Sequence, residues 1–87
     1  MAKQFVETRI LSLLIIDNSK YGHGVDFSTR IAYNEGEETL SCEMNGTEYV
    51  NLALEAKSDD PKRKSKALDE IIALIFRQNG IKIKKLA

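Results

Sequence analysis

Apolar and polar residues alternate most regularly in the middle of the chain. Every second position of the segment 25–34 is apolar or threonine, at Val25, Phe27, Thr29, Ile31 and Tyr33. A period of two is typical of a strand with one buried face. After turn residues at 34–37, the same spacing returns at Leu40, Cys42 and Met44. The pattern predicts two consecutive strands here.

The segment 5–16, FVETRILSLLII, fits either a strand or a helix. Helical spacing would align Val6, Ile10, Leu13 and Leu14. However, residues 10–16 are apolar at every position except Ser12 and end in two β-branched isoleucines. Such a short apolar run favours a buried strand, and we predict one.

The segment 47–57 is ambiguous in the same way. Asn45-Gly46 is a strong signal for a type I′ hairpin turn, and Val50, Leu52 and Leu54 alternate after it. We predict a fourth strand over 47–55. Strict alternation then places these three apolar residues opposite the face that carries Leu40 and Cys42.

A helix is predicted over 61–79, and both of its ends are marked. Asp60 can cap the first turn, Pro61 suits the first helical position, and Gly80 can leave the helix in the left-handed conformation. One apolar stripe runs along the helix, at Leu68, Ile71, Ile72, Ile75 and Phe76. After Gly80, Ile81 and Ile83 indicate a short final strand.

These elements predict one small α+β domain over residues 1–87. The expected order is ββββαβ, or αβββαβ if the first segment is helical, with the helix 61–79 on one face of an antiparallel sheet. A domain of this size has little room for an enclosed active site.

The predicted sheet has two apolar faces, while the chain supplies one long helix to cover them. A bulge could shift the phase of the strand 47–55, that segment could be helical, or a second subunit could cover the free face. We favour the second subunit and predict a homodimer. The expected dimer face consists of Leu11, Leu13, Ile15, Val50, Leu52 and Leu54.

Charge is unevenly distributed, although the formal net charge is zero. Residues 1–56 hold four Lys or Arg against nine Asp or Glu, a net charge of −5. Residues 57–87 hold nine against four, a net charge of +5. Cations also crowd the start of the helix 61–79, where the helix dipole disfavours them. A candidate anion-binding cluster is therefore formed by Lys62, Arg63, Lys64, Lys66, Lys82 and Lys84.

Part of this region resembles a known family. Residues 44–74, MNGTEYVNLALEAKSDDPKRKSKALDEIIAL, are similar to the second half of double-stranded-RNA-binding domains, in which a hairpin leads into a helix with a lysine-rich first turn. The resemblance implies phosphate contacts by Lys62, Arg63 and Lys66. The chain departs from that pattern in its acidic turn at 35–38, its strand-like first segment and its extra element at 81–86. We make no family assignment on this basis.

The side chains needed for catalysis or metal binding are sparse. One His and one Cys, His23 and Cys42, cannot supply a zinc site, and the acidic turn lacks calcium-loop spacing. No nucleophile motif or phosphate-binding glycine loop is present. We therefore expect no enzyme activity, no cofactor and no metal.

A single cysteine fits a reducing compartment, and the longest apolar run is too short to span a bilayer. We expect a cytoplasmic protein that does not enter a membrane. The leading hypothesis is a non-enzymatic homodimeric module that binds another protein, with inhibition of a larger partner as one form of this role. The alternative is binding of nucleic acid or a phosphate ligand through the basic cluster.

Overall fold

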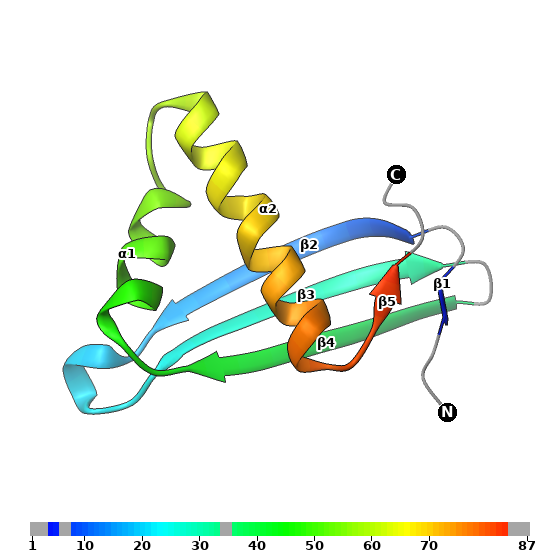
Figure 1. The fold of residues 1–87 in the computed structure, drawn as a ribbon, viewed down its shortest axis with the longest axis horizontal. Coiled ribbons are helices and arrows are strands. Elements are labelled where there is room, and N and C mark those ends of the chain that lie inside the picture. The colour runs from blue at the N-terminus through cyan, green and yellow to red at the C-terminus, as the bar shows by residue number, and fades with distance from the viewer. Residues whose placement is uncertain (1–3, 6–7, 34–35, 84–87) are drawn as a thin grey trace.

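The computed structural model describes residues 4–5, 8–33 and 36–83. Its main sheet has three antiparallel strands in the order β2 (Thr8–Asp17), β3 (Val25–Tyr33) and β4 (Gly36–Met44). Two helices follow, α1 (Thr47–Glu55) and α2 (Pro61–Gln78). A short parallel pair joins β1 (Gln4–Phe5) to β5 (Lys82–Ile83), so that the two ends of the described chain meet (Figure 1). The predicted α+β class is confirmed.

Both helices lie on one face of the sheet, and α2 crosses the three strands (Figure 1). The alternation of β3 explains the two layers. Val25, Phe27, Thr29 and Ile31 are buried, whereas the residues between them are exposed or half-buried. From α2, the buried residues Ala67, Ile71, Leu74, Ile75 and Phe76 complete the core. The opposite face of the sheet forms the outer face of the described domain.

A β-bulge in β2 decides which of its apolar residues join the core. The register shifts between Ile10, which lies opposite Ile31, and Ser12, which lies opposite Arg30. Beyond the shift, Leu13 lies opposite buried Thr29, and Ile15 lies opposite buried Phe27. The bulge therefore allows Ile10, Leu13 and Ile15 to pack against the same core although their spacing is three and then two.

Thr29 stabilises this irregularity from β3. Its side chain is buried, and its Oγ1 donates a hydrogen bond of 2.7 Å to the carbonyl oxygen of Ser12. A backbone carbonyl oxygen has two lone pairs, so the Ser12 carbonyl can accept a side-chain hydrogen bond at the bulge. The threonine hydroxyl donates this bond from within the sheet.

The prediction of a fourth strand over 47–55 is wrong, because this segment is the helix α1. Gly46 does not form a hairpin turn; it precedes the helix with φ 129° and ψ 152°. In a helix, Tyr49, Ala53 and Ala56 fall on one side, and Ala53 and Ala56 are buried. The alternation of Val50, Leu52 and Leu54 is incidental to this helical phase. The hairpin that supported the resemblance to double-stranded-RNA-binding domains is therefore absent.

The prediction for α2 is confirmed at both ends. The Asp60 carboxylate accepts a hydrogen bond of 3.0 Å from the Lys62 amide, and Pro61 occupies the first helical position. At the other end, the amides of Gly80 and Ile81 donate to the carbonyls of Arg77 and Phe76, with Gly80 at φ 66°. This pair of bonds is a Schellman motif, and Ile81 packs against the core beyond it.

Candidate interaction surfaces

Strand β2 is an edge strand with exposed aliphatic side chains. It is 10 residues long, and within the described part of the chain β3 is the one strand that pairs with it. On its outer side, Leu14 is 57% exposed, Ile16 is 45% exposed and Leu11, in the bulge, is 39% exposed. We call these three side chains, together with the unpaired edge of the strand, the β2 surface. A long edge strand that carries apolar side chains can pair with another chain.

The rest of the outer face is polar. Leu14 and Ile16 lie opposite Ser28 and Asp26 of β3, and these residues lie opposite Ser41 and Glu43 of β4. Farther along, Arg30 forms an exposed ion pair with Glu37. Among the described residues, the large exposed apolar side chains of this face therefore belong to the strand at one edge.

The structure divides the six residues predicted as a dimer face. Leu13 and Ile15 pack against the core from β2, and Val50 and Leu52 pack against it from α1. Leu11 and Leu54 are exposed, but they belong to different elements, β2 and α1. The exposed aliphatic side chains of β2 are thus those of the opposite phase, Leu14 and Ile16, joined by Leu11.

The opposite edge of the sheet, β4, differs in character. Glu37 and Glu43 are exposed along it. The side chain of Asn79, at the end of α2, donates a hydrogen bond of 3.1 Å to the carbonyl of Ser41. Acidic side chains and a capped backbone group are both features that discourage pairing at a sheet edge.

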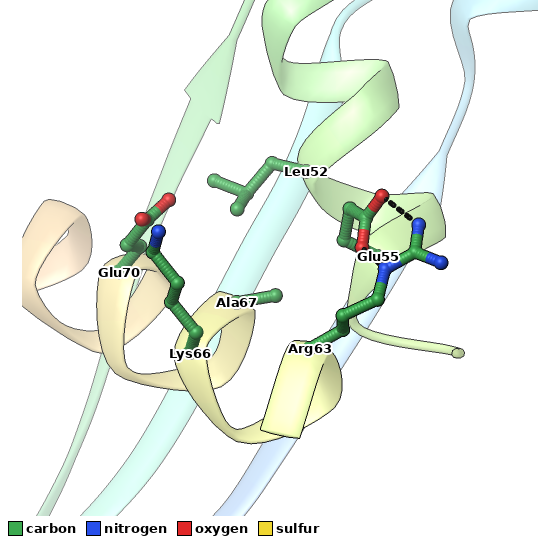
Figure 2. A pocket seen from close by; sticks show the side chains of 6 residues that line it. All are labelled: Leu52, Glu55, Arg63, Lys66, Ala67 and Glu70. Atoms are coloured by element: carbon green, nitrogen blue, oxygen red, sulfur yellow. Dashed lines mark hydrogen bonds and ion pairs between the residues drawn. The ribbon is translucent and has the colours of Figure 1, made fainter. Parts of the chain in front are cut away.

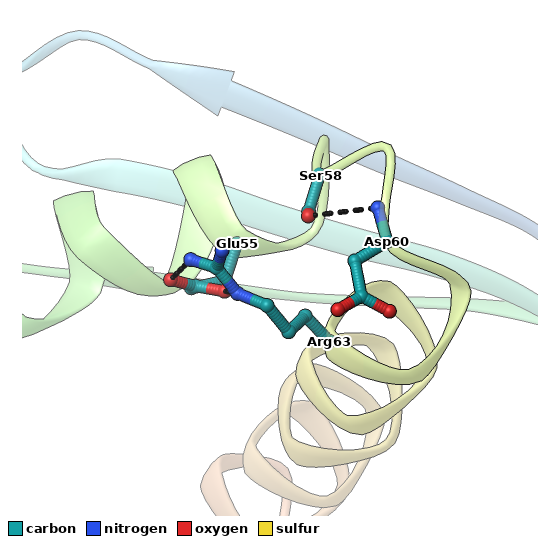
Figure 3. A network of polar contacts seen from close by, with 4 residues as sticks. All are labelled: Glu55, Ser58, Asp60 and Arg63. Carbon is teal, nitrogen blue, oxygen red and sulfur yellow. Dashed lines mark hydrogen bonds and ion pairs between the residues drawn. The ribbon is translucent and has the colours of Figure 1, made fainter.

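Four members of the basic cluster lie in the first turns of α2, and one of them, Arg63, is already bound within the chain. Arg63 forms an ion pair with Glu55, the last residue of α1, and its Nε donates to Glu55 Oε2 at 2.8 Å (Figure 3). The hydrogen bond from Arg63, reinforced by its charge, lowers the pKa of Glu55; the same contact raises the pKa of Arg63. Asp60 adds a second carboxylate, and its own amide donates to the Ser58 hydroxyl at 3.1 Å.

The other predicted members of the cluster are exposed or outside the described side chains. Lys62, Lys64 and Lys66 are exposed on the first turns of α2. The structure describes Lys82 only as part of the backbone of β5, and Lys84 lies outside the described residues. Three lysines therefore face solvent beside an arginine that is already paired.

A shallow hollow of about 280 Å³ lies between α1 and α2 (Figure 2). Leu52 and Ala67 supply its apolar lining, and Glu55, Arg63, Lys66 and Glu70 supply its charged lining. The charges balance, since two are positive and two are negative. The hollow is open to solvent and lies just below the range of about 300–1,000 Å³ found for small-molecule pockets.

The single cysteine and the single histidine lie in different parts of the fold. Cys42 lies half-buried in β4, and burial, with a smaller contribution from the Asp26 charge, raises the pKa of its thiol. A raised pKa leaves less of the nucleophilic thiolate at neutral pH. His23 is exposed in the β2–β3 connection. Among the described residues, no three His, Cys, Asp or Glu side chains gather in a way that could hold a metal ion.

No helix within the described ranges has the length and apolar character needed to cross a membrane. Comparisons with protein-family models, with curated proteins and with solved structures returned no match to this chain.

Two features of these surfaces were missed by sequence reasoning. The pairing of Arg63 with Glu55 requires α1 to end beside the first turn of α2, and the predicted strand over 47–55 concealed that geometry. The exposure of Leu14 and Ile16 depends on the bulge at 10–12. The sequence shows that both sides of this segment are apolar, but the side that faces the helices is decided by the register with β3.

Proposed function

We propose that this chain is a non-enzymatic interaction module that binds another protein and works as a homodimer, with the β2 surface forming the contact between its two copies. The observation that carries the proposal is the exposure of Leu11, Leu14 and Ile16 on β2, which forms an edge of the sheet within the described part of the chain. Burying such side chains contributes about 25 cal/mol for each Å² of apolar surface removed from water. Pairing the strand edge also satisfies backbone groups that otherwise bind water.

The contrast between the two sheet edges supports this assignment. The β4 edge carries Glu37 and Glu43 and has its Ser41 carbonyl bound by Asn79. The β2 edge has aliphatic side chains at the corresponding outer positions. A sheet that protects one edge and leaves the other apolar is suited to a closed pair of subunits rather than an open fibre.

The proposal is tested by the mass of the protein in solution. Light scattering at tens of micromolar should give twice the chain mass of 9.8 kDa, with little change when salt is added, because the contact is mainly apolar. Leu14→Lys should yield a monomer, since a lysine would place a charge in the contact. Leu54→Lys is the matched control: Leu54 is 62% exposed but lies on α1, so this variant should stay dimeric. A monomeric wild-type protein would refute the proposal.

The second candidate function is binding of a nucleic-acid backbone by the exposed lysines of α2. The exposure of Lys62, Lys64 and Lys66 favours it. The nearby carboxylates of Asp60 and Glu55 oppose it, because they already bind the first-turn amide of Lys62 and the Arg63 side chain. It predicts duplex-RNA binding that weakens steeply with salt and is lost in a Lys62→Ala, Lys66→Ala variant. Lack of binding at low salt would exclude it.

A further inference from the structure

We infer that the second copy adds to the sheet by antiparallel pairing of β2 with β2, centred on Leu14, to form one six-stranded sheet. This inference rests on the proposed dimer and specifies its geometry. A twofold axis perpendicular to the sheet makes the two equivalent edges antiparallel and continues one sheet through both copies. The charges of the strand fit that direction, since exposed Arg9 lies near its start and Asp17 forms its end. Antiparallel pairing brings the basic end of each strand toward the acidic end of the other.

Asp17 is anionic at neutral pH in this arrangement. Hydrogen bonds from Ser19, including one of 2.8 Å from its backbone amide, lower the pKa of the Asp17 carboxyl. Parallel pairing of the two β2 strands in register would instead place Arg9 beside Arg9 and Asp17 beside Asp17. Such neighbouring like charges repel each other.

Two hydrogen bonds reveal which backbone groups of β2 are free to pair. The Ser12 carbonyl accepts from Thr29 Oγ1, so it points toward β3. Backbone groups of successive residues in an antiparallel strand point to opposite sides, so those of Leu14 also point toward β3. The groups of Leu13 and Ile15 therefore point to the open edge.

The opposite side of the sheet gives the same result. The Ser41 carbonyl is bound by Asn79 and points away from β3. Ser41 lies opposite Ser28, and Ser28 lies opposite Leu14. Because the pairing alternates, Ser28 is hydrogen-bonded to the β2 side, and its partner there is Leu14. Both hydrogen bonds therefore indicate that the backbone groups of Leu13 and Ile15 point to the open edge.

The register follows from the extent of the regular strand. The bulge ends at Ser12, so the straight part of β2 is 12–17. Pairing centred on Leu14 uses residues 12–16 of this part: Leu14 meets Leu14 of the second copy, Ser12 meets Ile16, and Leu13 exchanges backbone hydrogen bonds with Ile15. A centre at Leu13 would draw the bulge into the contact, and a centre at Ile15 would place Leu13 against Asp17.

This register makes Leu14 a non-hydrogen-bonded pair, the kind whose Cα atoms approach to about 4.5 Å. That separation lies within the range that a disulfide can bridge, about 4.4–6.8 Å. Ser12 of one copy and Ser12 of the other would be four residues apart along the strands, about 13 Å. Positions 12 and 14 lie on the same face of β2, but the distance between the two copies of each residue differs.

The test is disulfide crosslinking in a Cys42→Ser background. Leu14→Cys should give a disulfide-linked dimer as the main product of mild oxidation, and the matched control Ser12→Cys should stay uncrosslinked. Efficient crosslinking of Ser12→Cys, or none of Leu14→Cys while the reduced variant is dimeric by light scattering, would overturn the register. A wild-type monomer would instead overturn the proposed function.

Amide hydrogen exchange of the wild-type protein provides a second measurement that does not depend on the cysteine variants. The Leu13 and Ile15 amides should exchange slowly in the dimer and become fast in the Leu14→Lys variant. Fast exchange of both amides in a dimer of wild-type protein would also overturn the inference, because these groups carry the pairing.

Discussion

Replacing Thr29 by Val isolates the hydrogen bond that supports the β2 bulge. Valine has nearly the shape of threonine, but it cannot donate to the Ser12 carbonyl, which now lies 2.7 Å from Thr29 Oγ1. Thr29 is 1% exposed, so water cannot easily replace its hydroxyl from the threonine side. Ser12 itself is exposed, and its carbonyl can regain part of its hydration.

These observations limit how much unfolding free energy the Thr29→Val substitution can remove. A hydrogen bond contributes about 0.5–1.5 kcal/mol net, and an unsatisfied buried partner costs about 1–3 kcal/mol. Partial hydration of the Ser12 carbonyl and the added apolar methyl group both reduce the loss. We expect Thr29→Val to destabilise the fold by about 1 kcal/mol, which corresponds to a decrease in melting temperature of about 4–8 °C for a domain of this size.

Urea unfolding followed by circular dichroism measures this difference. Thr29→Ser is the control, because it keeps the hydroxyl and loses a buried methyl group worth about 0.8 kcal/mol plus a small cavity. Amide exchange separates the two variants: faster exchange around 10–13 is expected for Thr29→Val alone. If Thr29→Val is as stable as the wild type and shows unchanged exchange at the bulge, the hydroxyl does not support the bulge.

Two other predictions concern packing and pH. Gly24→Ala should cost about 1–3 kcal/mol in thermal unfolding, because its Cβ would lie 2.6 Å from the Met44 carbonyl oxygen; unchanged stability would contradict this close approach. Ser19 holds the pKa of Asp17 below its ordinary 3.8, and Arg63 holds the pKa of Glu55 below its ordinary 4.5. The two ionised carboxylates therefore stabilise the fold above about pH 4.5, and this stabilisation is lost as the pH falls through the lowered pKa values. Urea midpoints at about pH 6 and about pH 3 should therefore differ less in an Asp17→Asn, Glu55→Gln variant than in the wild type, and equal differences would contradict the assignment.

Local patterns predicted several elements correctly. The alternation of β3 is long and regular, and it agrees with both its strand state and its buried face. The ends of α2 are marked by Asp60, Pro61 and Gly80, whose roles depend on backbone geometry within one turn. Such signals need no knowledge of distant parts of the chain.

The wrong prediction arose where the local pattern favoured a strand and a helix almost equally. Asn45-Gly46 and the alternation after it favour a hairpin, whereas Tyr49, Ala53 and Ala56 have helical spacing. The core decides between them, because a helix buries Ala53 and Ala56 on the face of the sheet that also receives α2. Tertiary packing outweighs propensities of less than about 1 kcal/mol per residue.

For the candidate surfaces too, some properties come from the sequence and others from the tertiary structure. The sequence by itself determined that residues 10–16 are apolar on both sides and that cations gather at 62–66, because these are properties of composition and spacing. The tertiary structure alone decided that Leu14 and Ile16 face outward and that Arg63 is bound by Glu55. The first follows from the bulge opposite β3, and the second from α1 ending beside α2. Both depend on contacts between segments that are separate in the chain, and no local pattern encodes such contacts.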